Sequence, residues 1–96
     1  MNAPVHYKFC LYVAGDAENS RVAIANLRDI CERFLSARHQ VELIDVLREP
    51  MRALADGVFM TPMLVKLTPS PVRKIVGSLS NRATVLQALD LPALVA

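Results

Sequence analysis

The two cysteines are the residues of this chain that could carry redox chemistry. Cys10 lies in an apolar run near the start of the chain, and Cys31 lies in a second apolar pattern further along. A dithiol enzyme needs two sulfurs where a strand turns into a helix, one with a pKa lowered by the helix N-terminus and one to resolve the mixed disulfide. The polar turn after the first run, residues 15–20, contains no sulfur. We therefore expect both cysteines to be reduced, buried and unreactive.

The remaining candidates for chemistry are weaker. His6 and His39 lie far apart, without Cys, Asp or Glu at metal-ligand spacing, so we expect surface histidines. Ser80 is not part of a G-x-S-x-G elbow, and its place before an apolar pattern favours helix capping. Asp45 and Glu49 have nothing to fix them around a cleft, which favours solvated carboxylates. The sequence thus predicts no catalytic residue, no metal site and no cofactor.

Composition limits the kinds of partner. The 96 residues are 53% hydrophobic and 21% charged, with a formal charge of +2. That charge is too small to hold nucleic acid through counterion release. We see neither a signal peptide nor an apolar run as long as a membrane span. We expect one domain over residues 1–96, located in the cytoplasm, with some apolar surface available to a partner.

Basic residues gather around one predicted hairpin: Lys66, Arg73, Lys74 and Arg82. Because side chains alternate along a strand, Arg73 and Lys74 would point to opposite faces, so the group need not form one patch. No aromatic residue is interleaved with these charges to stack bases, which argues against nucleic acid. A solvated face and a contact site for an acidic partner are equally good interpretations.

The first half of the chain predicts three elements. Alternating aromatic and aliphatic residues predict a first strand over Tyr7–Val13, ended by Gly15. Asn19 or Ser20 is the expected N-cap of the next element, a helix. Its apolar face is Ile24, Leu27, Ile30, Cys31, Phe34 and Leu35. Residues 41–47 predict a second strand, which pairs parallel to the first through a right-handed crossover.

The second half of the chain predicts a short helix, a hairpin and a final helix. Pro50 suits the first position of the short helix, and Asp56-Gly57 can end it. Strands over residues 63–67 and 72–76 are separated by prolines, which favours an antiparallel hairpin. Ser80 is expected to cap a last helix whose apolar face is Val85, Leu86 and Leu89. The resulting order is βαβαββα.

This order is the thioredoxin arrangement, an α/β fold whose active site lies between the first strand and the first helix. Thr61-Pro62 stands where thioredoxin-like proteins carry a cis-proline, and by that resemblance we expect a cis bond here. One functional hypothesis is therefore a thioredoxin-fold thiol oxidoreductase or a peroxide-handling enzyme. An accessible thiol of low pKa would support that hypothesis, and slow alkylation of both cysteines would oppose it.

A second hypothesis comes from motifs that follow one another in order between Phe9 and Leu91. They are Leu11-Tyr12-Val13-Ala14-Gly15, Asn19-Ser20, Ile44-Asp45-Val46-Leu47 with Pro50, Thr61-Pro62, Pro71-Val72-Arg73-Lys74-Ile75-Val76-Gly77 and Leu79-Ser80-Asn81-Arg82. With these motifs the chain resembles the KaiB family of circadian clock proteins, which is related to the sensor domain of SasA-type histidine kinases.

The resemblance implies a non-enzymatic protein without a cofactor that binds the ATPase ring of a KaiC-type hexamer. A histidine kinase or another clock protein is a further implied partner, and the implied role is circadian timing or stress adaptation. Members of the family are metamorphic: besides βαβαββα they adopt a βαββααβ arrangement that assembles as tetramers. We accordingly expect a homo-oligomer, a dimer or a tetramer, in the resting state.

Matching positions imply the site residues. Lys66, Arg73 and Lys74 match basic residues of the family implicated in partner contact, and the segment from Arg48 to Asp56 matches part of the surface that faces KaiC. The structural positions carried by the same motifs are Gly15, Pro62, Pro71, Gly77 and Ala88.

Several positions depart from the family pattern. Glu42 and Gly57 stand where members often have lysine, and Ser70 interrupts a common run of prolines. Ala88 stands where members often have glycine, in a segment that is helical in the thioredoxin-like state. Alanine favours a helix over glycine by roughly 1 kcal/mol, about fivefold in a two-state balance. We therefore expect the thioredoxin-like state to be well populated in this protein.

Overall fold

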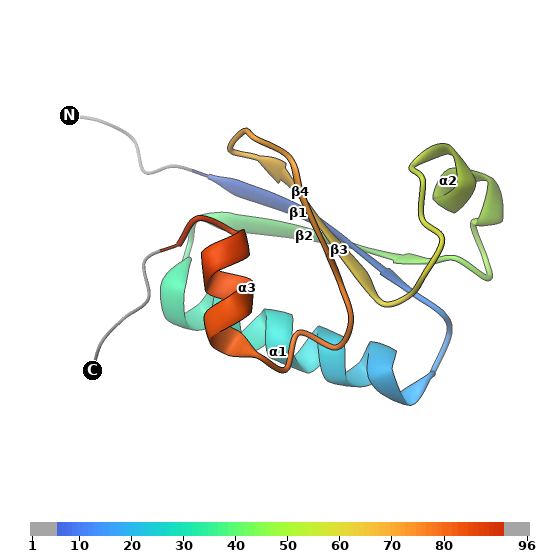
Figure 1. Cartoon of the computed structure of the whole chain (residues 1–96), viewed down its shortest axis with the longest axis horizontal. Coiled ribbons are helices and arrows are strands. Elements are labelled where there is room, and N and C mark those ends of the chain that lie inside the picture. The colour runs from blue at the N-terminus through green and yellow to red at the C-terminus, as the bar shows by residue number, and fades with distance from the viewer. Residues whose placement is uncertain (1–5, 92–96) are drawn as a thin grey trace.

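A computed structural model describes residues 6–91 of the chain (Figure 1). Its elements follow the predicted order βαβαββα. They are β1 (Tyr7–Val13), α1 (Glu18–Phe34), β2 (His39–Asp45), α2 (Pro50–Ala55), β3 (Met63–Thr68), β4 (Arg73–Val76) and α3 (Arg82–Ala88). Among the described residues no helix has the length and apolar character needed to cross a membrane.

The four strands form one mixed sheet in the order β2-β1-β3-β4. As predicted, β1 pairs parallel with β2 across the α1 crossover. In the observed register Leu11 lies opposite Leu43. β3 pairs antiparallel with β1, and β4 pairs antiparallel with β3 as the predicted hairpin. The central strands β1 and β3 therefore carry the core on both faces of the sheet.

Alternation along β1 divides the core into two clusters of unequal size. Phe9, Leu11 and Val13 point to the larger cluster, which α1 and α3 complete with residues such as Leu27 and Leu86. Cys10 and Tyr12 point to the other face, where the smaller cluster contains Ile44, Met63 and Val65. Figure 1 shows α1 and α3 together on one side of the sheet and α2 on the other side, near one end of the strands.

The two expected helix caps were wrong. α1 begins at Glu18 with Ala17 as its N-cap, which makes no side-chain capping bond, so Asn19 and Ser20 lie inside the first turn. The Ser20 hydroxyl instead accepts a hydrogen bond from the Ala14 amide at 3.2 Å. For α3 the N-cap is Asn81 rather than Ser80. The Asn81 side chain accepts from the Thr84 amide at 3.1 Å.

The ends of three strands also differ slightly from the predicted ends. β2 covers residues 39–45 rather than 41–47, because after Asp45 the chain turns toward α2. β3 runs one residue further than expected, to Thr68, and β4 begins at Arg73. The pattern of alternation located each strand, whereas the turn geometry set its ends.

The structural positions carried by the family motifs lie where the chain turns. Gly15 has a φ of 53°, a left-handed conformation that glycine adopts without strain, and its amide donates to the Asp45 carboxylate at 3.1 Å. Gly77 has a φ of 117° directly after β4. Thr61-Pro62 is cis, as expected, and so is Ser70-Pro71. Ala88 is the last residue of α3.

Candidate protein-interaction site

The segment from Leu47 to Met60 contains the most exposed large apolar side chains of the described chain. Phe59 is 83% exposed and Met51 is 74% exposed, and Leu47, Leu54 and Met60 are also well exposed. Exposed apolar residues scattered singly are ordinary in proteins, but five within one segment are typical of a contact surface. We call residues 47–60, with α2 at their centre, the α2 segment.

Local interactions shape the α2 segment. Pro50 occupies the first turn of α2, where its missing N–H has no helical partner to lose. The helix ends at the Asp56 C-cap, and the Val58 amide then donates to the Ala53 carbonyl at 2.9 Å. Ala53 is buried, and Val58 packs on the smaller core cluster. The apolar side chains at Met51 and Leu54 are thereby left facing solvent.

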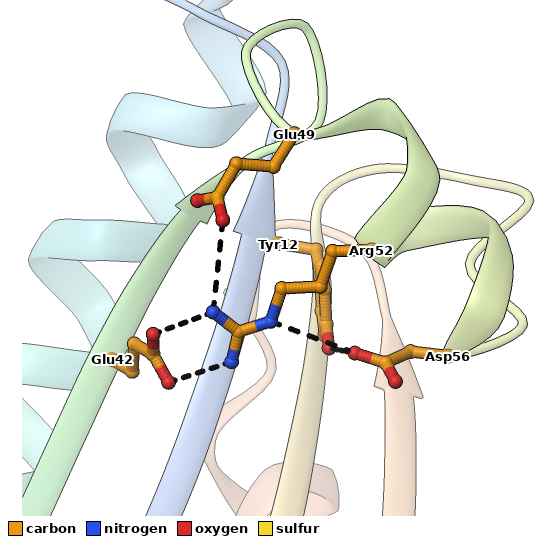
Figure 2. A network of polar contacts seen from close by, with 5 residues as sticks. All are labelled: Tyr12, Glu42, Glu49, Arg52 and Asp56. Atoms are coloured by element: carbon orange, nitrogen blue, oxygen red, sulfur yellow. Dashed lines mark hydrogen bonds and ion pairs between the residues drawn. The ribbon is translucent and has the colours of Figure 1, made fainter.

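A polar network attaches α2 to the sheet (Figure 2). The Arg52 guanidinium donates two hydrogen bonds to the two carboxylate oxygens of Glu42 on β2, both at 2.7 Å. It also lies 3.8 Å from a Glu49 oxygen and 4.0 Å from an Asp56 oxygen. The Tyr12 hydroxyl on β1 donates to Asp56. The network thus connects Arg52, inside α2, to β2 and Asp56, at the end of α2, to β1.

The charges of this network affect one another. The hydrogen bond from Arg52 lowers the pKa of Glu42, and that bond also raises the pKa of Arg52. Burial and the hydrogen bond to Asp56 raise the pKa of Tyr12. At neutral pH the network therefore contains a cationic Arg52, an anionic Glu42 and a neutral Tyr12.

The basic residues predicted to contact a partner do not lie together. Arg73 and Lys74 lie on opposite faces of β4, as alternation predicted. Lys74 lines a cavity of about 350 Å³ beside α2, whose other lining residues include Cys10, Tyr12, Arg52 and Asp56. Arg48, at the start of the α2 segment, is well exposed.

Lys66, for which the resemblance implied a partner contact, is buried in this structure. Its side chain is 1% exposed, and its ammonium group lies 3.5 Å from the Asp90 carboxylate. Arg73, opposite Lys66 in the hairpin, reaches the same Asp90 oxygen at 3.4 Å. In this conformation Lys66 therefore holds the end of α3 rather than facing solvent. Asp56 is exposed but already accepts the Tyr12 hydroxyl.

Comparison with known proteins identifies the family. The KaiB domain model matches residues 10–91, which include every helix and strand except the first residues of β1. The chain belongs to the KaiB family. A circadian clock oscillator protein KaiB of Prochlorococcus marinus strain MIT 9313 is 47% identical over 85 residues, covering 88% of this chain and 71% of that protein. A KaiB clock protein of Thermosynechococcus vestitus is 45% identical over 85 residues, covering 88% of this chain and 79% of that protein.

Solved structures extend the comparison to the fold. The N-terminal domain of SasA from Synechococcus elongatus has a TM-score of 0.72 at 17% identity, covering 100% of this chain and 94% of that chain. Mitochondrial thioredoxin 3 of Saccharomyces cerevisiae has a TM-score of 0.71 at 17% identity, covering 91% and 80%. This KaiB-family chain therefore has the thioredoxin-like fold, and at such identities the likeness concerns the fold alone.

The cysteines of this KaiB-family protein do not form a thioredoxin-type centre. Cys10 and Cys31 are free and buried. Burial raises the pKa of Cys31 to about 11, and burial is also the main cause of the raised pKa of Cys10. A reactive thiol needs the opposite shift together with access to solvent. Both thiols thus have the environment that the sequence predicted. The described residues contain no cluster of ligands suited to a metal ion.

Asp45 was wrongly expected to be merely solvated. Its carboxylate accepts hydrogen bonds from the Gly15 amide at 3.1 Å and the Leu47 amide at 2.9 Å. These bonds join the turn after β1 to the turn after β2. They fix the place where the α2 segment leaves the sheet.

Sequence reasoning missed the Arg52 network and the most exposed apolar residues of the α2 segment. Phe59 and Met60 lie outside every predicted element, and two large apolar residues in a loop were a signal that was present but unused. Glu42 was noticed as a departure from lysine, yet its partner Arg52 is on a different element. Only the fold brings these two side chains together.

Proposed function

We propose that this KaiB-family protein is a non-enzymatic clock or signalling protein that binds the ATPase ring of a KaiC-type hexamer. The observation that carries the proposal is the α2 segment, where five large apolar side chains are exposed within a member of a clock-protein family. Burial of such side chains at an interface contributes roughly 25 cal/mol per Å² of apolar area. The place of action is the cytoplasm.

Charged residues in and beside the α2 segment supply specificity. Arg48 carries positive charge at its start, Asp56 carries negative charge at the end of α2, and Lys74 carries positive charge in the neighbouring cavity. Charges at the rim of an interface direct encounter and select partners more than they add affinity. Arg73 lies on the other face of β4 and belongs to a second contact area, for a histidine kinase or another clock protein.

The βαβαββα state is the one that binds in this proposal. A homo-oligomer, a dimer or a tetramer, is the resting form from which a monomer is released. Ala88 at the end of α3 supports a well-populated βαβαββα state, because alanine lowers the free energy of the helix relative to glycine. A partner that binds one of two states shifts the equilibrium toward it.

The test is size-exclusion chromatography with light scattering, run on the protein alone and with the KaiC-type ATPase of the same organism plus nucleotide. Co-elution is expected for the native chain. Phe59→Ser and Met51→Ser should each lower the affinity for the ATPase ring at least about tenfold, as substitutions of central interface residues do. Val41→Ser is the matched control, since Val41 is exposed but lies beside α1, away from the α2 segment. The proposal is rejected if the native chain does not co-elute at tens of micromolar, or if all three variants bind as it does.

A further inference from the structure

The attachment of α2 to the sheet is largely polar. α2 has six residues, and Ala53 is the one that is buried. Isolated helices shorter than about 12–15 residues are marginal in water, so α2 needs tertiary contacts to persist. One buried alanine methyl supplies little of the apolar burial that normally holds an amphipathic helix. Another interaction must fix this helix.

Arg52 is placed to provide that interaction. It lies on the side of α2 that faces the sheet, and its two terminal nitrogens meet both oxygens of Glu42 (Figure 2). A bidentate pair of guanidinium and carboxylate fixes direction as well as distance. The Tyr12 hydroxyl holds Asp56, one turn after Arg52, so the helix is attached at two points to two strands.

The groups around Arg52 come from every element packed on this side. Glu42 is on β2, Tyr12 and Cys10 are on β1, Lys74 is on β4, and Glu49 and Asp56 flank the helix itself. Three carboxylates thus surround one guanidinium, and Glu42 is the one that accepts both hydrogen bonds. An attachment of this kind is partly exposed, so dissolved salt weakens it.

We infer that Arg52 is a positioning residue: its fork onto Glu42 fixes α2 on the sheet and thereby holds Met51 and Leu54 in the orientation that a partner meets. The presentation of Met51 and Leu54 to a partner rests on the proposed function, because a fixed α2 matters only if the α2 segment binds a partner. Ordering the helix before the partner arrives removes an entropic cost from association.

The free protein provides the primary test, by amide hydrogen exchange read at single residues. The reporters are the amides of Ala53, Asp56, Gly57 and Val58, all of which donate to carbonyls within the α2 segment. Arg52→Gln and Glu42→Gln should each speed exchange at these amides about fivefold or more, and the double variant should be no faster than Arg52→Gln. Added salt should speed exchange in the native protein but not in Arg52→Gln.

Two further variants separate positioning from charge and from general destabilisation. Arg52→Lys keeps the charge but loses the fork, so it should resemble Arg52→Gln rather than the native chain. Arg33→Gln removes a comparable pair on α1, where the Arg33 and Asp29 side chains meet at 2.9 Å, and should leave the α2 amides unchanged. Exchange in β1 and β3 reports whether any variant has loosened the whole fold.

Native exchange rates at the α2 amides in both Arg52→Gln and Glu42→Gln would overturn the inference, as would strictly additive effects in the double variant. Affinity for the ATPase ring is the second readout, and it should fall in the same variants in proportion to the faster exchange. Faster exchange with unchanged affinity would overturn the positioning role. If the native chain itself fails to bind the ring, the proposed function fails, while exchange still decides whether Arg52 fixes α2.

Discussion

Lys66 carries a charge into the interior, and Asp90 is what makes that burial tolerable. The Lys66 side chain is 1% exposed, whereas the Asp90 side chain is 49% exposed and also meets Arg73. Asp90 follows α3 with a φ of 61°, a left-handed conformation that aspartate and asparagine tolerate better than most residues. The Asp90 carboxylate in this turn thus links the end of α3 to the hairpin by ion pairs.

Removing the Asp90 carboxylate should therefore lower the free energy of unfolding more than removing the exposed Arg73 guanidinium. Asp90→Asn retains the backbone preference but leaves Lys66 without a counter-charge, so the free energy of unfolding should fall by about 1–3 kcal/mol. Arg73→Gln should cost less than about 1 kcal/mol, because Arg73 is half exposed. Urea denaturation measures both.

The double variant provides the control. Lys66→Met removes the buried charge, so adding Asp90→Asn to it should cost much less than Asp90→Asn alone. Equal costs in the two backgrounds would show that Asp90 acts through its backbone turn instead of through Lys66.

The two thiols should be protected by the fold. Cys31 has a pKa of about 11 in place of its ordinary 9.0, so at pH 8 its thiolate fraction is about 100-fold lower than in the unfolded chain. Alkylation followed by mass spectrometry should find both Cys10 and Cys31 unmodified in the native protein and modified in urea. Rapid labelling of either thiol in the folded state would reopen the hypothesis of thiol chemistry.

Sequence reasoning reached some of this residue-scale structure but not all of it. Alternation placed Arg73 and Lys74 on opposite faces because that depends only on the pleat of a strand. It could not predict that Lys66 is buried, because the counter-charge Asp90 comes from a different element. The Arg52 fork was missed for the same reason.

At the scale of elements, apolar periodicity, together with Pro50 and Asp56-Gly57 for α2, predicted the seven helices and strands of the described chain, and local geometry set their ends. Ser20 has the type of an N-cap residue, but its hydroxyl accepts from Ala14 and so joins the preceding turn instead. Ala17, a poor capping residue, is left in the cap position. A capping preference thus gives way to a neighbouring hydrogen bond that the sequence does not display.

The N-terminal end of α3 depends on the Asn81 side chain. Asn81→Ala removes the acceptor for the Thr84 amide and should lower the free energy of unfolding by about 1 kcal/mol. Ser80→Ala is the neighbouring control, and it should change stability by less than about 0.5 kcal/mol. Thermal unfolding followed by circular dichroism compares the two variants. An equal loss of stability in both would contradict Asn81 as the single capping residue.

A capping side chain at the start of α1 should raise the free energy of unfolding. Ala17→Ser places a hydroxyl where the free amides of the first turn can donate, so the free energy of unfolding should rise by about 0.5–1 kcal/mol. The same exchange at exposed Ala25, inside α1, should lower it by up to about 0.5 kcal/mol. Opposite signs at the two positions are the expected result, and a loss at both would place the helix start elsewhere.

At the scale of the whole molecule, three acidic protons are held more tightly by the fold than by the unfolded chain. Burial raises the pKa values of Cys31, Tyr12 and Cys10, with Asp56 adding to the effect on Tyr12. A group with a raised pKa stabilises the folded state below its unfolded pKa and loses that contribution as pH rises through its folded pKa. Stability should therefore decline from about pH 9 upward.

Urea midpoints measured at pH 8 and pH 10.5 check this sign. The midpoint should be lower at the higher pH, and the decline should be smaller in Cys31→Ala, which is compared only with itself because its smaller side chain also lowers stability at pH 8. A midpoint that rises with pH would mean that these groups do not control alkaline stability.

The unequal faces of the sheet have an evolutionary consequence. The large cluster with α1 and α3 carries most of the buried side chains, while the face with α2 has a small cluster and an attachment made of charges. Substitutions in the α2 segment can accordingly accumulate with little penalty in foldability, whereas those under α1 cannot. A protein built on this scaffold can therefore change the binding surface around α2 while the packing under α1 and α3 stays the same.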